Sequence, residues 1–282
     1  MKDLKSNWPK LLRAILVAYG TMFLFLESFE VLSDINIGFN YAVFLTSGAV
    51  LGVLFYVFDG FLIEGYLKSE VQIPMEFCNT SLSIKFGDLF EQSGWKVVGV
   101  NDFFDSEVND IVISSRSLHG FVLRKFWPHN IEDWEAQIEE SINEMPIESV
   151  ERAMGKSVRY PIGTTGVGRT HDHNFLFVAL TKTDETNHVT SATAEVLIRA
   201  ARGMLAHARE VCGNQPLNIP LMGSELARVN IKKSMLVDLL VAAIQEESQH
   251  GRITKEISII LTPDLKGKVN LKNYHRNWGH GL

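Results

Sequence analysis

Residues 39–58 read FNYAVFLTSGAVLGVLFYVF, a run of twenty residues without a charged side chain. At about 1.5 Å of rise per residue, a helix of this length reaches roughly 30 Å, the thickness of the hydrocarbon layer of a bilayer. The whole chain is 46% hydrophobic, an ordinary average for a globular protein, but its apolar residues crowd into residues 1–67. We therefore expect a transmembrane helix at about residues 39–60.

The preceding stretch, residues 11–32, is apolar as well and predicts a second, weaker span. Arg13 lies at its start and Glu27 and Glu30 near its end, so that only residues 14–26 are free of charge. A cleaved signal peptide is the alternative, but no small-x-small cleavage site follows the apolar run. The sequence favours a membrane hairpin of two helices.

The distribution of basic residues predicts how this hairpin is oriented. Four of them precede or begin the first span (Lys2, Lys5, Lys10 and Arg13), whereas the end of that span and the short connection to the next carry Glu30 and Asp34 and no basic residue. Lysine and arginine accumulate on the cytoplasmic side of membrane proteins. We expect a two-pass membrane protein whose N-terminus and C-terminal domain both lie in the cytoplasm.

Small residues recur at helical spacing in both predicted spans. Gly48 and Gly52 form a GxxxG motif, and Ala14 and Ala18 form a similar pair in the first span. Such faces let helices approach each other closely in lipid. Glycine is also common in transmembrane helices in general, so the motif alone leaves helix association open.

The net charge and the cysteine content argue against nucleic-acid binding, a disulfide scaffold and a structural zinc site. The chain has a formal net charge of −6, which gives no general attraction to the phosphates of nucleic acids. Its two cysteines, Cys78 and Cys212, are far apart in the sequence and form no CxxC pair. This argues against a disulfide scaffold and against a structural zinc site.

The rest of the chain reads as an α/β domain. Leu82, Ile84 and Phe86 alternate with polar residues, which is the pattern of a half-buried strand. Further strands are predicted at residues 97–100, 111–113, 175–180, 217–222 and 257–261, and helices at residues 121–127, 131–143, 191–212 and 231–247, of which 131–143 reads as exposed and acidic. Strands that alternate with helices indicate a largely parallel or mixed sheet. We place the domain at residues 80–265, after a connector at 68–79 and before a loose tail at 266–282.

Three loops follow predicted strands of this domain, at residues 87–89, 117–120 and 223–226. In open α/β sheets ligands bind beyond the carboxyl ends of the strands, where loop amides and helix N-termini offer donors to anions. Glycine lets the backbone approach a phosphate closely, and Asp88 could accept a hydrogen bond from an exocyclic amine. The alternative is that these are ordinary turns, with Asp88 as a cap.

The loop at residues 163–170, GTTGVGRT, differs from a Walker A motif by Arg169 in the place of lysine. A P-loop must open a helix, whereas residues 174–178 continue as a strand, so we do not expect an NTPase. His171 and His173 have no further cluster of ligands in the sequence, and we expect a solvated turn rather than a metal site.

The sequences of residues 84–89, of the strand that ends at Asn101 and of residues 218–224 resemble the macro domain. This family is a three-layer α/β/α module that binds ADP-ribose. The resemblance implies that Asp88 contacts adenine and that the phosphate loops are residues 117–120 and 223–226. The predicted ligand-binding residues are Gly87, Asp88, Leu89, Asn101, Ser117, Leu118, His119, Gly120, Thr164, Thr165, Gly223, Ser224, Glu225 and Leu226.

A macro domain behind two transmembrane helices resembles the membrane-anchored effectors of Thoeris anti-phage defence. The resemblance implies a TIR-domain partner that consumes NAD and makes an ADP-ribose derivative, here a histidine-linked ADP-ribose. It also implies that the chain lies in the bacterial inner membrane, and that the effector binds this signal, forms a homo-oligomer and disrupts the lipid bilayer, which kills the infected cell. No cofactor, metal or catalytic residue is expected.

The sequence departs from the macro-domain pattern in two places. The usual Val-Asn-Ala-Ala-Asn run is here Val98-Gly99-Val100-Asn101, and the glycine-rich first phosphate loop is reduced to Gly120. These changes favour binding without hydrolysis. The alternative is a membrane-tethered ADP-ribosyl hydrolase in which Asn101 orients water, and a third interpretation is a constitutive channel whose soluble domain only assembles.

Overall fold

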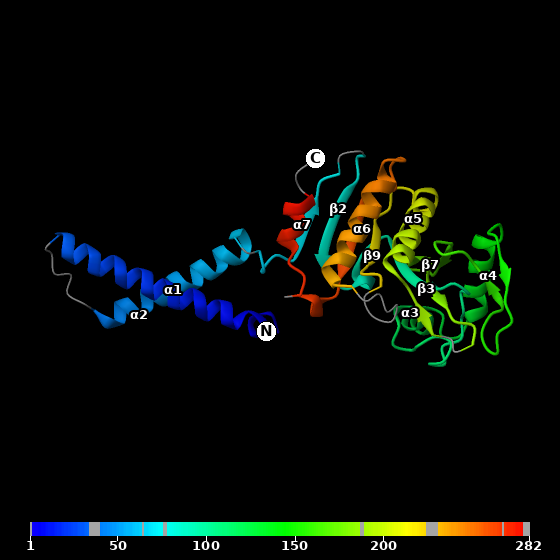
Figure 1. Cartoon of the computed structure of the whole chain (residues 1–282), viewed down its shortest axis with the longest axis horizontal. Coiled ribbons are helices and arrows are strands. Elements are labelled where there is room, and N and C mark those ends of the chain that lie inside the picture. Colours follow the sequence, from blue (N-terminus) through cyan, green and yellow to red (C-terminus); the bar gives the residue numbers. More distant parts are fainter. Residues whose placement is uncertain are drawn as a thin grey trace.

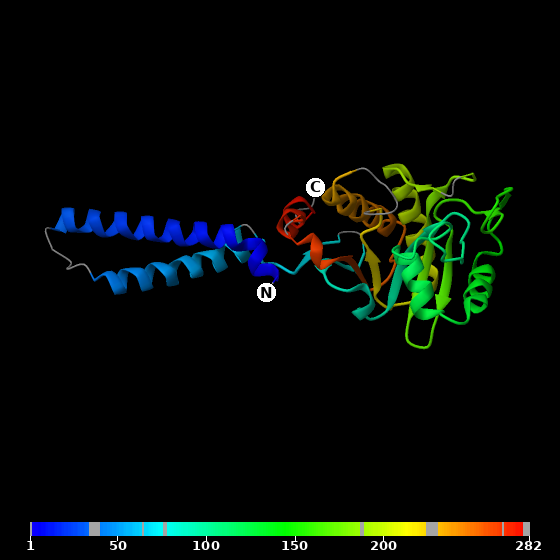
Figure 2. The ribbon, with the colours of Figure 1, turned by 90° about the horizontal axis from the view of Figure 1, so that it is seen from below.

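The computed structural model describes residues 2–33, 40–63, 65–75, 78–186, 189–223, 231–266 and 268–278. A hairpin of two long helices projects from an α/β domain, and the N-terminal end of the first helix lies toward that domain (Figures 1 and 2). The molecule is therefore elongated, with the apolar helical hairpin at one end and the α/β domain at the other.

The hairpin consists of α1 (Lys2–Ser33) and α2 (Tyr41–Phe58), and α2 continues into a π-helical turn, η1 (Asp59–Ile63). Asn40 caps α2, since its side chain accepts hydrogen bonds from the backbone amides of Ala42 and Val43. The ranges Trp8–Ser33 and Tyr41–Leu62 are long and apolar enough to cross a membrane. Most of their large apolar side chains are exposed.

The glycine motif of α2 faces α1 within the hairpin. A Cβ atom on Gly52 would lie 2.6 Å from Cα of Ile15, and one on Gly48 would overlap the ring of Tyr19. The Tyr19 hydroxyl donates to the carbonyl of Leu45 at 2.6 Å. The small residues therefore form an intramolecular seam, which we call the glycine seam.

The domain is built on a mixed sheet. Its strands are β1 (Glu70–Ile73), β2 (Ser81–Phe86), β3 (Trp95–Asn101), β6 (Thr165–Arg169), β7 (Asn174–Thr183), β8 (Thr190–Ser191), β9 (Leu217–Pro220) and β10 (Glu256–Leu261). The order is β1-β2-β10-β9-β3-β7-β6, and β8 pairs with β7. The five inner strands are parallel, whereas β1 and β6 run antiparallel to their neighbours. A separate short ribbon joins β4 (Glu148–Ser149) to β5 (Val158–Arg159).

Helices cover both faces of the sheet, which makes three layers (Figure 1). One face packs on α5 (Ala194–Val211) and α6 (Lys233–Ser248), and the other packs on α3 (Leu118–Phe126) and α4 (Ile131–Ile142). Alternate residues of one strand serve opposite cores, because successive side chains of a strand point to opposite faces. Leu176 packs with α5 and α6, and Phe177 packs with α3 and α4. The predicted α/β/α fold with a mixed sheet is confirmed.

Three local predictions are wrong. Residues 111–113 form no strand, because the side chain of Asn109 accepts hydrogen bonds from the amides of Ile111 and Val112 at 2.9 and 2.7 Å and bends the chain. The predicted connector contains β1, which extends the sheet. The predicted loose tail contains α7 (Leu271–Trp278), whose residues Leu271 and Tyr274 are buried in the core.

Short 3₁₀ turns complete the domain. The first, η2 (Leu89–Glu91), lies in the connection from β2 to β3, and the second, η3 (Pro263–Leu265), follows β10. The connection from β2 to β3 passes β9, where Nδ2 of Asn218 donates to the carbonyl of Ser93 at 2.7 Å. The connection starts from β2 in the sheet, and the bond to Ser93 also fixes its far end to β9.

Candidate functional site

The five parallel strands end at one edge of the sheet. Their last residues are Phe86, Leu261, Pro220, Asn101 and Thr183. In this fold class the loops beyond that edge bind ligands. The strand order places the loop after β9 between the loop after β2 and the loop after β3. The structure therefore brings three predicted loops to a common edge.

Asp88 lies in the loop after β2, and its side chain is exposed. Its Oδ1 accepts a hydrogen bond from the amide of Phe90 at 2.8 Å, which caps η2. Within the described residues its other oxygen, Oδ2, accepts no hydrogen bond. The capping interpretation is thus correct, and it leaves one carboxylate oxygen for a ligand.

The neighbours of Asp88 differ in what they can offer. Gly87 donates its amide to the carbonyl of Leu261 at 2.9 Å, which ties the loop to β10. The side chain of Leu89 is buried. Of the three predicted residues in this loop, only Asp88 offers a side chain to a ligand, because Gly87 has none and that of Leu89 is buried.

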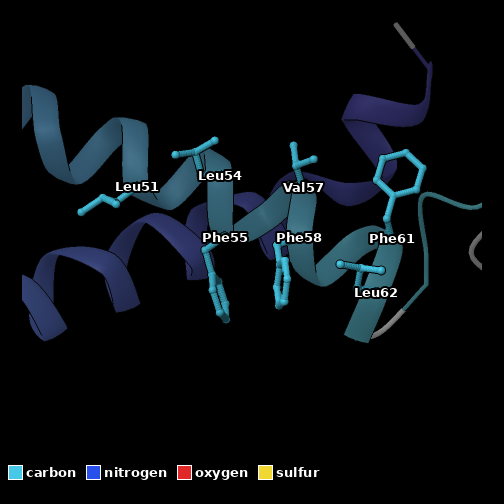
Figure 3. Close-up of a pocket in the computed structure, with 7 residues that line it drawn as sticks. All are labelled: Leu51, Leu54, Phe55, Val57, Phe58, Phe61 and Leu62. Carbon is cyan, nitrogen blue, oxygen red and sulfur yellow. The ribbon is translucent and has the colours of Figure 1, made fainter.

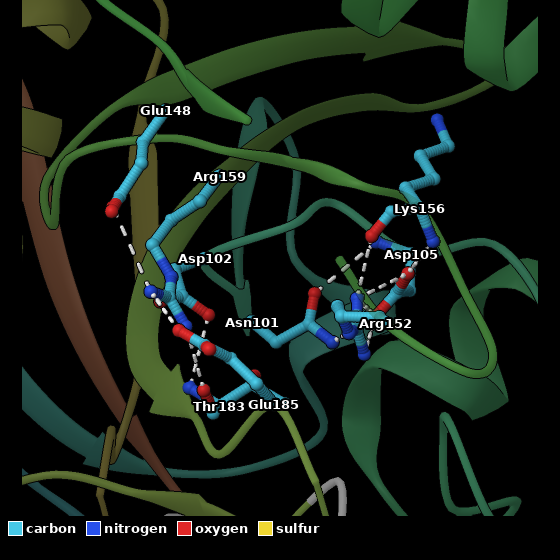
Figure 4. Close-up of polar contacts among 9 residues, drawn as sticks. All are labelled: Asn101, Asp102, Asp105, Glu148, Arg152, Lys156, Arg159, Thr183 and Glu185. Atoms are coloured by element: carbon cyan, nitrogen blue, oxygen red, sulfur yellow. Dashed lines mark hydrogen bonds and ion pairs between the residues drawn. The ribbon is translucent and has the colours of Figure 1, made fainter. Parts of the chain in front are cut away.

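The loop after β3 is held by the side chain of Asn101. Its Nδ2 donates to Oδ2 of Asp105 at 2.7 Å, and its Oδ1 accepts from the amide of Asp105 at 3.1 Å (Figure 4). Both residues are buried. Because both ends of the amide group are engaged, Asn101 is fixed as a structural residue of the loop.

Asp105 also forms a fully buried ion pair. Arg152 Nη1 lies 3.2 Å from Oδ2 of Asp105, and neither side chain is exposed to solvent. The backbone amide of Lys156 donates to Oδ1 of Asp105 at 2.7 Å, and the Arg152 guanidinium lies 3.9 Å from the ring centroid of Phe103. The segment from Arg152 to Lys156 is thereby fastened onto the loop after β3.

A second ion pair secures the end of β3 to the end of β7. Arg159 Nε lies 3.2 Å from Oδ2 of Asp102, and the amide of Thr183 donates to Oδ1 of Asp102 at 3.0 Å. Burial raises the pKa of the Asp102 carboxyl, although hydrogen bonding by Thr183 and the charge of Arg159 oppose the rise. Arg159 also contacts Glu185 at 2.7 Å.

Sequence reasoning missed these ion pairs. The charged residues Asp102, Asp105, Arg152 and Arg159 belong to no motif, and the partners lie about fifty residues apart in the chain. The sequence indicated only that the strand ends at Asn101 and Asp102.

The predicted first phosphate loop, residues 117–120, forms the first turn of α3. Ser117 is its N-cap, and its Oγ accepts from the amide of Gly120 at 2.9 Å. The first amides of a helix have no acceptor within the helix, which leaves those of Leu118 and His119 for another group. Such a helix N-terminus is suited to an anion.

The imidazole of His119 points into the core instead. It is buried, and its ring centroid lies 5.8 Å from that of Trp134 and 6.5 Å from that of Phe177. Burial lowers the pKa of His119 to about 3. A ligand at this loop would therefore meet the backbone amide of His119 and not its side chain.

The glycines of the two loops differ in what the fold requires. A Cβ atom on Gly120 would overlap the carbonyl oxygen of Ser114, whereas one on Gly87 would meet only Nε2 of Gln92 at 3.5 Å. We expect Gly120→Ala to lower the free energy of unfolding by about 1–3 kcal/mol, since a well-packed backbone must move. Gly87→Ala should unfold like the wild type. Urea unfolding of both variants in detergent micelles checks this, and an equal loss in both would contradict it.

Thr164 and Thr165 lie far from Asp88 and the loop after β2. Both are buried, and Oγ1 of Thr165 donates to the carbonyl of Gly163 at 2.9 Å. β6 is five strand spacings from β2, which corresponds to roughly 24 Å. The loop leads into β6, which pairs antiparallel with β7, and so it lacks the strand-loop-helix order of a Walker A motif.

The loop after β9 begins with two buried residues, Leu221 and Met222. Gly223 follows in the left-handed region with φ of 78°, a conformation that favours glycine. The predicted residues Ser224, Glu225 and Leu226 lie outside the described part of the chain. The loop leads toward α6, whose first residue is Lys233.

An apolar concavity of about 560 Å³ lies on the hairpin rather than on the domain (Figure 3). It is lined by Leu51, Leu54, Phe55, Val57, Phe58, Phe61 and Leu62. No polar side chain lines it, so it does not suit a nucleotide. Its position on a candidate membrane span fits contact with lipid chains.

Comparison with known proteins agrees with this architecture. The family model described as Thoeris protein ThsA, Macro domain, matches residues 82–262. Thoeris protein ThsA of Bacillus amyloliquefaciens (strain Y2) is 26% identical over 219 residues, 73% of this chain and 71% of the relative. A mutant Oceanobacillus iheyensis macrodomain with ADPR aligns with a TM-score of 0.51 and 11% identity, over 74% of this chain and 97% of that chain. The same macrodomain with ADP gives a TM-score of 0.49 and 10% identity, with the same coverage.

The family model spans well over half of the 282 residues, and the matched range begins in β2 and ends just after β10. It therefore includes every parallel strand and every loop of the candidate site. The chain belongs to the ThsA macro-domain family of Thoeris proteins.

Proposed function

We propose that the domain is the receptor for an ADP-ribose-type nucleotide signal. The observation that supports this most directly is Asp88, an exposed carboxylate at the end of β2 with one oxygen that no described residue occupies. Gly223, just after β9, and the first turn of α3 lie at the same edge, and their backbone amides are donors suited to phosphates. A solved relative of the same fold is described as a macrodomain with ADPR.

The domain binds this ligand without hydrolysing it. A hydrolase would need a side chain that orients water, and Asn101 was the candidate for that role. Its amide is bonded at both ends to Asp105, at 2.7 and 3.1 Å, which holds the side chain against the loop rather than free to orient water. Turnover of an ADP-ribosylated substrate by the purified chain would favour the hydrolase alternative instead.

The signal acts on the membrane through the hairpin. A TIR-domain partner supplies an ADP-ribose derivative, with the histidine-linked form as our specific candidate, and the bound chains form a homo-oligomer that disrupts the inner membrane. A ligand drives such a change only by preferring the assembled state. A shift from about 1% to about 99% assembled requires roughly 5.5 kcal/mol of preference. Multivalency within one assembly helps to supply it.

The binding site is tested by Asp88→Asn in the full chain held in nanodiscs. Asparagine still accepts from the Phe90 amide, so the turn stays capped, but the charged acceptor is lost. A hydrogen bond to a charged group contributes about 1.5–3 kcal/mol, so we expect the Kd for ADP-ribose to rise roughly 10- to 100-fold. Calorimetric titration with ADP-ribose and with its histidine conjugate measures this.

Glu91→Gln is the matched control, because Glu91 is an exposed carboxylate in the same turn. It should bind like the wild type. Equal affinity of Asp88→Asn and the wild type would remove Asp88 from the site, and no binding by the wild type would remove the receptor function itself. Depolarisation of cells without any ligand would instead support the constitutive channel.

A further inference from the structure

The segment that joins the hairpin to the domain, residues 65–69, is called the junction from this point on. Tyr66 connects it to both helices of the hairpin. Its hydroxyl donates to the carbonyl of Tyr56 in α2 at 3.0 Å, and the ring centroids of Tyr56 and Tyr66 lie 5.4 Å apart. Nζ of Lys10 in α1 lies 3.9 Å from the centroid of the Tyr66 ring. One side chain of the junction therefore contacts α1 and α2 together.

The junction also meets the strand that carries Asp88. The carbonyl of Ser69 accepts from the amide of Phe86 at 2.9 Å. Phe86 is the last residue of β2 and immediately precedes Gly87 and Asp88. The first ligand loop is thus bonded to the junction through a single backbone contact.

A second route reaches the junction through α7. Gly65 packs so closely on α7 that a Cβ atom would lie 2.6 Å from Cβ of Lys272. In Figure 1, α7 lies between the inner end of the hairpin and α6, beside the strands of the sheet edge. It packs on β1 and shares the core of the domain through Leu271 and Tyr274.

Two hydrogen bonds fasten α7 to the start of α6. The Tyr274 hydroxyl donates to the carbonyl of Ser234 at 3.1 Å, and Nε1 of Trp278 donates to Oδ1 of Asp238 at 2.9 Å. Ser234 and Asp238 lie in the first two turns of α6. The start of α6 therefore reaches the junction through α7.

We propose that α7 and the junction form the coupling element that links the loop after β2 and the start of α6 to the membrane hairpin. The identity of the ligand is taken from the proposed function, whereas the contacts of the coupling element are present without a ligand. The end of β2 and the start of α6 both connect to one five-residue segment, and that segment contacts both helices of the hairpin. A ligand that orders the loops changes the hairpin by shifting the arrangement of this segment.

Hydrogen exchange of the full chain in nanodiscs, without ligand, tests the coupling. Tyr66→Leu removes the contacts with Tyr56 and Lys10. If the element is coupled, amide exchange should rise about tenfold in α7, in the first turns of α6 and at Phe86, because local opening free energies are shared within a cooperative unit. Tyr41→Leu is the matched control, since Tyr41 begins α2 at the far end of the hairpin. An increase confined to residues 56–69 would overturn the proposal.

Exchange in the presence of ADP-ribose separates the coupling from the receptor function. In the wild type, ADP-ribose should protect the ligand loops, the junction and α7, and also the inner ends of α1 and α2. In Tyr66→Leu it should protect the loops as before, while the protection no longer extends to the inner ends of α1 and α2. Protection in the wild type that stops at the loops would contradict the coupling. The ligand-free exchange decides the coupling independently of whether ADP-ribose is the ligand.

Discussion

The His119→Phe variant should keep its stability at acidic pH values at which the wild-type domain loses it. The pKa of His119 is lowered from 6.5 to about 3 by burial, so the folded chain holds the imidazole neutral. Below pH 6.5 the imidazole of His119 binds a proton in the unfolded state but stays neutral in the folded state. The free energy of unfolding therefore decreases as the pH falls from 6.5 toward 3. At about 1.4 kcal/mol per unit of pKa, the full loss is on the order of 5 kcal/mol. Phenylalanine suits the aromatic surroundings and removes the titration.

Urea unfolding of the domain between pH 7 and 4, in the full chain held in detergent micelles, measures this effect. Carboxylates titrate in the same range, so the decisive quantity is the difference in slope between variant and wild type. His171→Phe is the matched control, because the His171 side chain is 98% exposed. It should leave the slope unchanged. Parallel curves for His119→Phe and the wild type would show that the buried imidazole does not set the acid stability.

Breaking the buried pair between Asp105 and Arg152 should cost about 3–5 kcal/mol in the free energy of unfolding. In Arg152→Ala the carboxylate of Asp105 stays buried with only the amide of Lys156 and the Asn101 side chain as partners. In Asp105→Leu the guanidinium of Arg152 loses the carboxylate of Asp105. The double variant Asp105→Leu with Arg152→Met should be more stable than either single variant, because it leaves no uncompensated charge.

A double-mutant cycle by urea unfolding gives the coupling energy directly. The control cycle uses Glu195 and Arg199, which are paired at 2.6 Å with side chains 77% and 57% exposed. An exposed pair of this spacing contributes only about 0.3–0.5 kcal/mol. Similar coupling energies in the two cycles would mean that burial of the Asp105 pair does not strengthen it.

The sequence was sufficient wherever local pattern sets structure. The alternation at Leu82, Ile84 and Phe86 predicted β2, and its direct continuation into Gly87 and Asp88 placed a loop at the correct edge of the sheet. Ser117 preceded an apolar helical run, and it is the N-cap of α3. The run at residues 39–58 predicted α2. Each of these signals lies within a few neighbouring residues, where side-chain periodicity and capping act.

Tertiary contacts account for what could not be predicted. The acidic helix α4 looked exposed, yet Trp134 and Ile138 on one of its faces are fully buried against the sheet. The apolar residues of α7 are few. Its packing on β1 and the hydrogen bonds of Tyr274 and Trp278 to α6 show why the helix forms. Partners so distant in the chain leave no spacing signal.

The same reason explains the incomplete prediction of the site. Asn101 was visible as the end of a strand, but its bonds to Asp105 depend on how the following loop folds back. The burial of the His119 ring depends on Trp134 and Phe177, which come from α4 and β7. The sequence indicated which loops reach the edge of the sheet, and the fold determines which of their side chains turn toward it.

The glycine seam has a consequence for how the chain is made. The first helix carries Glu27 and Glu30 and is the weaker candidate for insertion on its own, whereas the second is uncharged from its start to Phe58. Because Gly48 and Gly52 let α2 lie directly against Ile15 and Tyr19, the two helices form a preassembled pair. We therefore expect the second helix to assist the insertion of the first into a bilayer, so that the hairpin enters as one unit rather than as two successive segments.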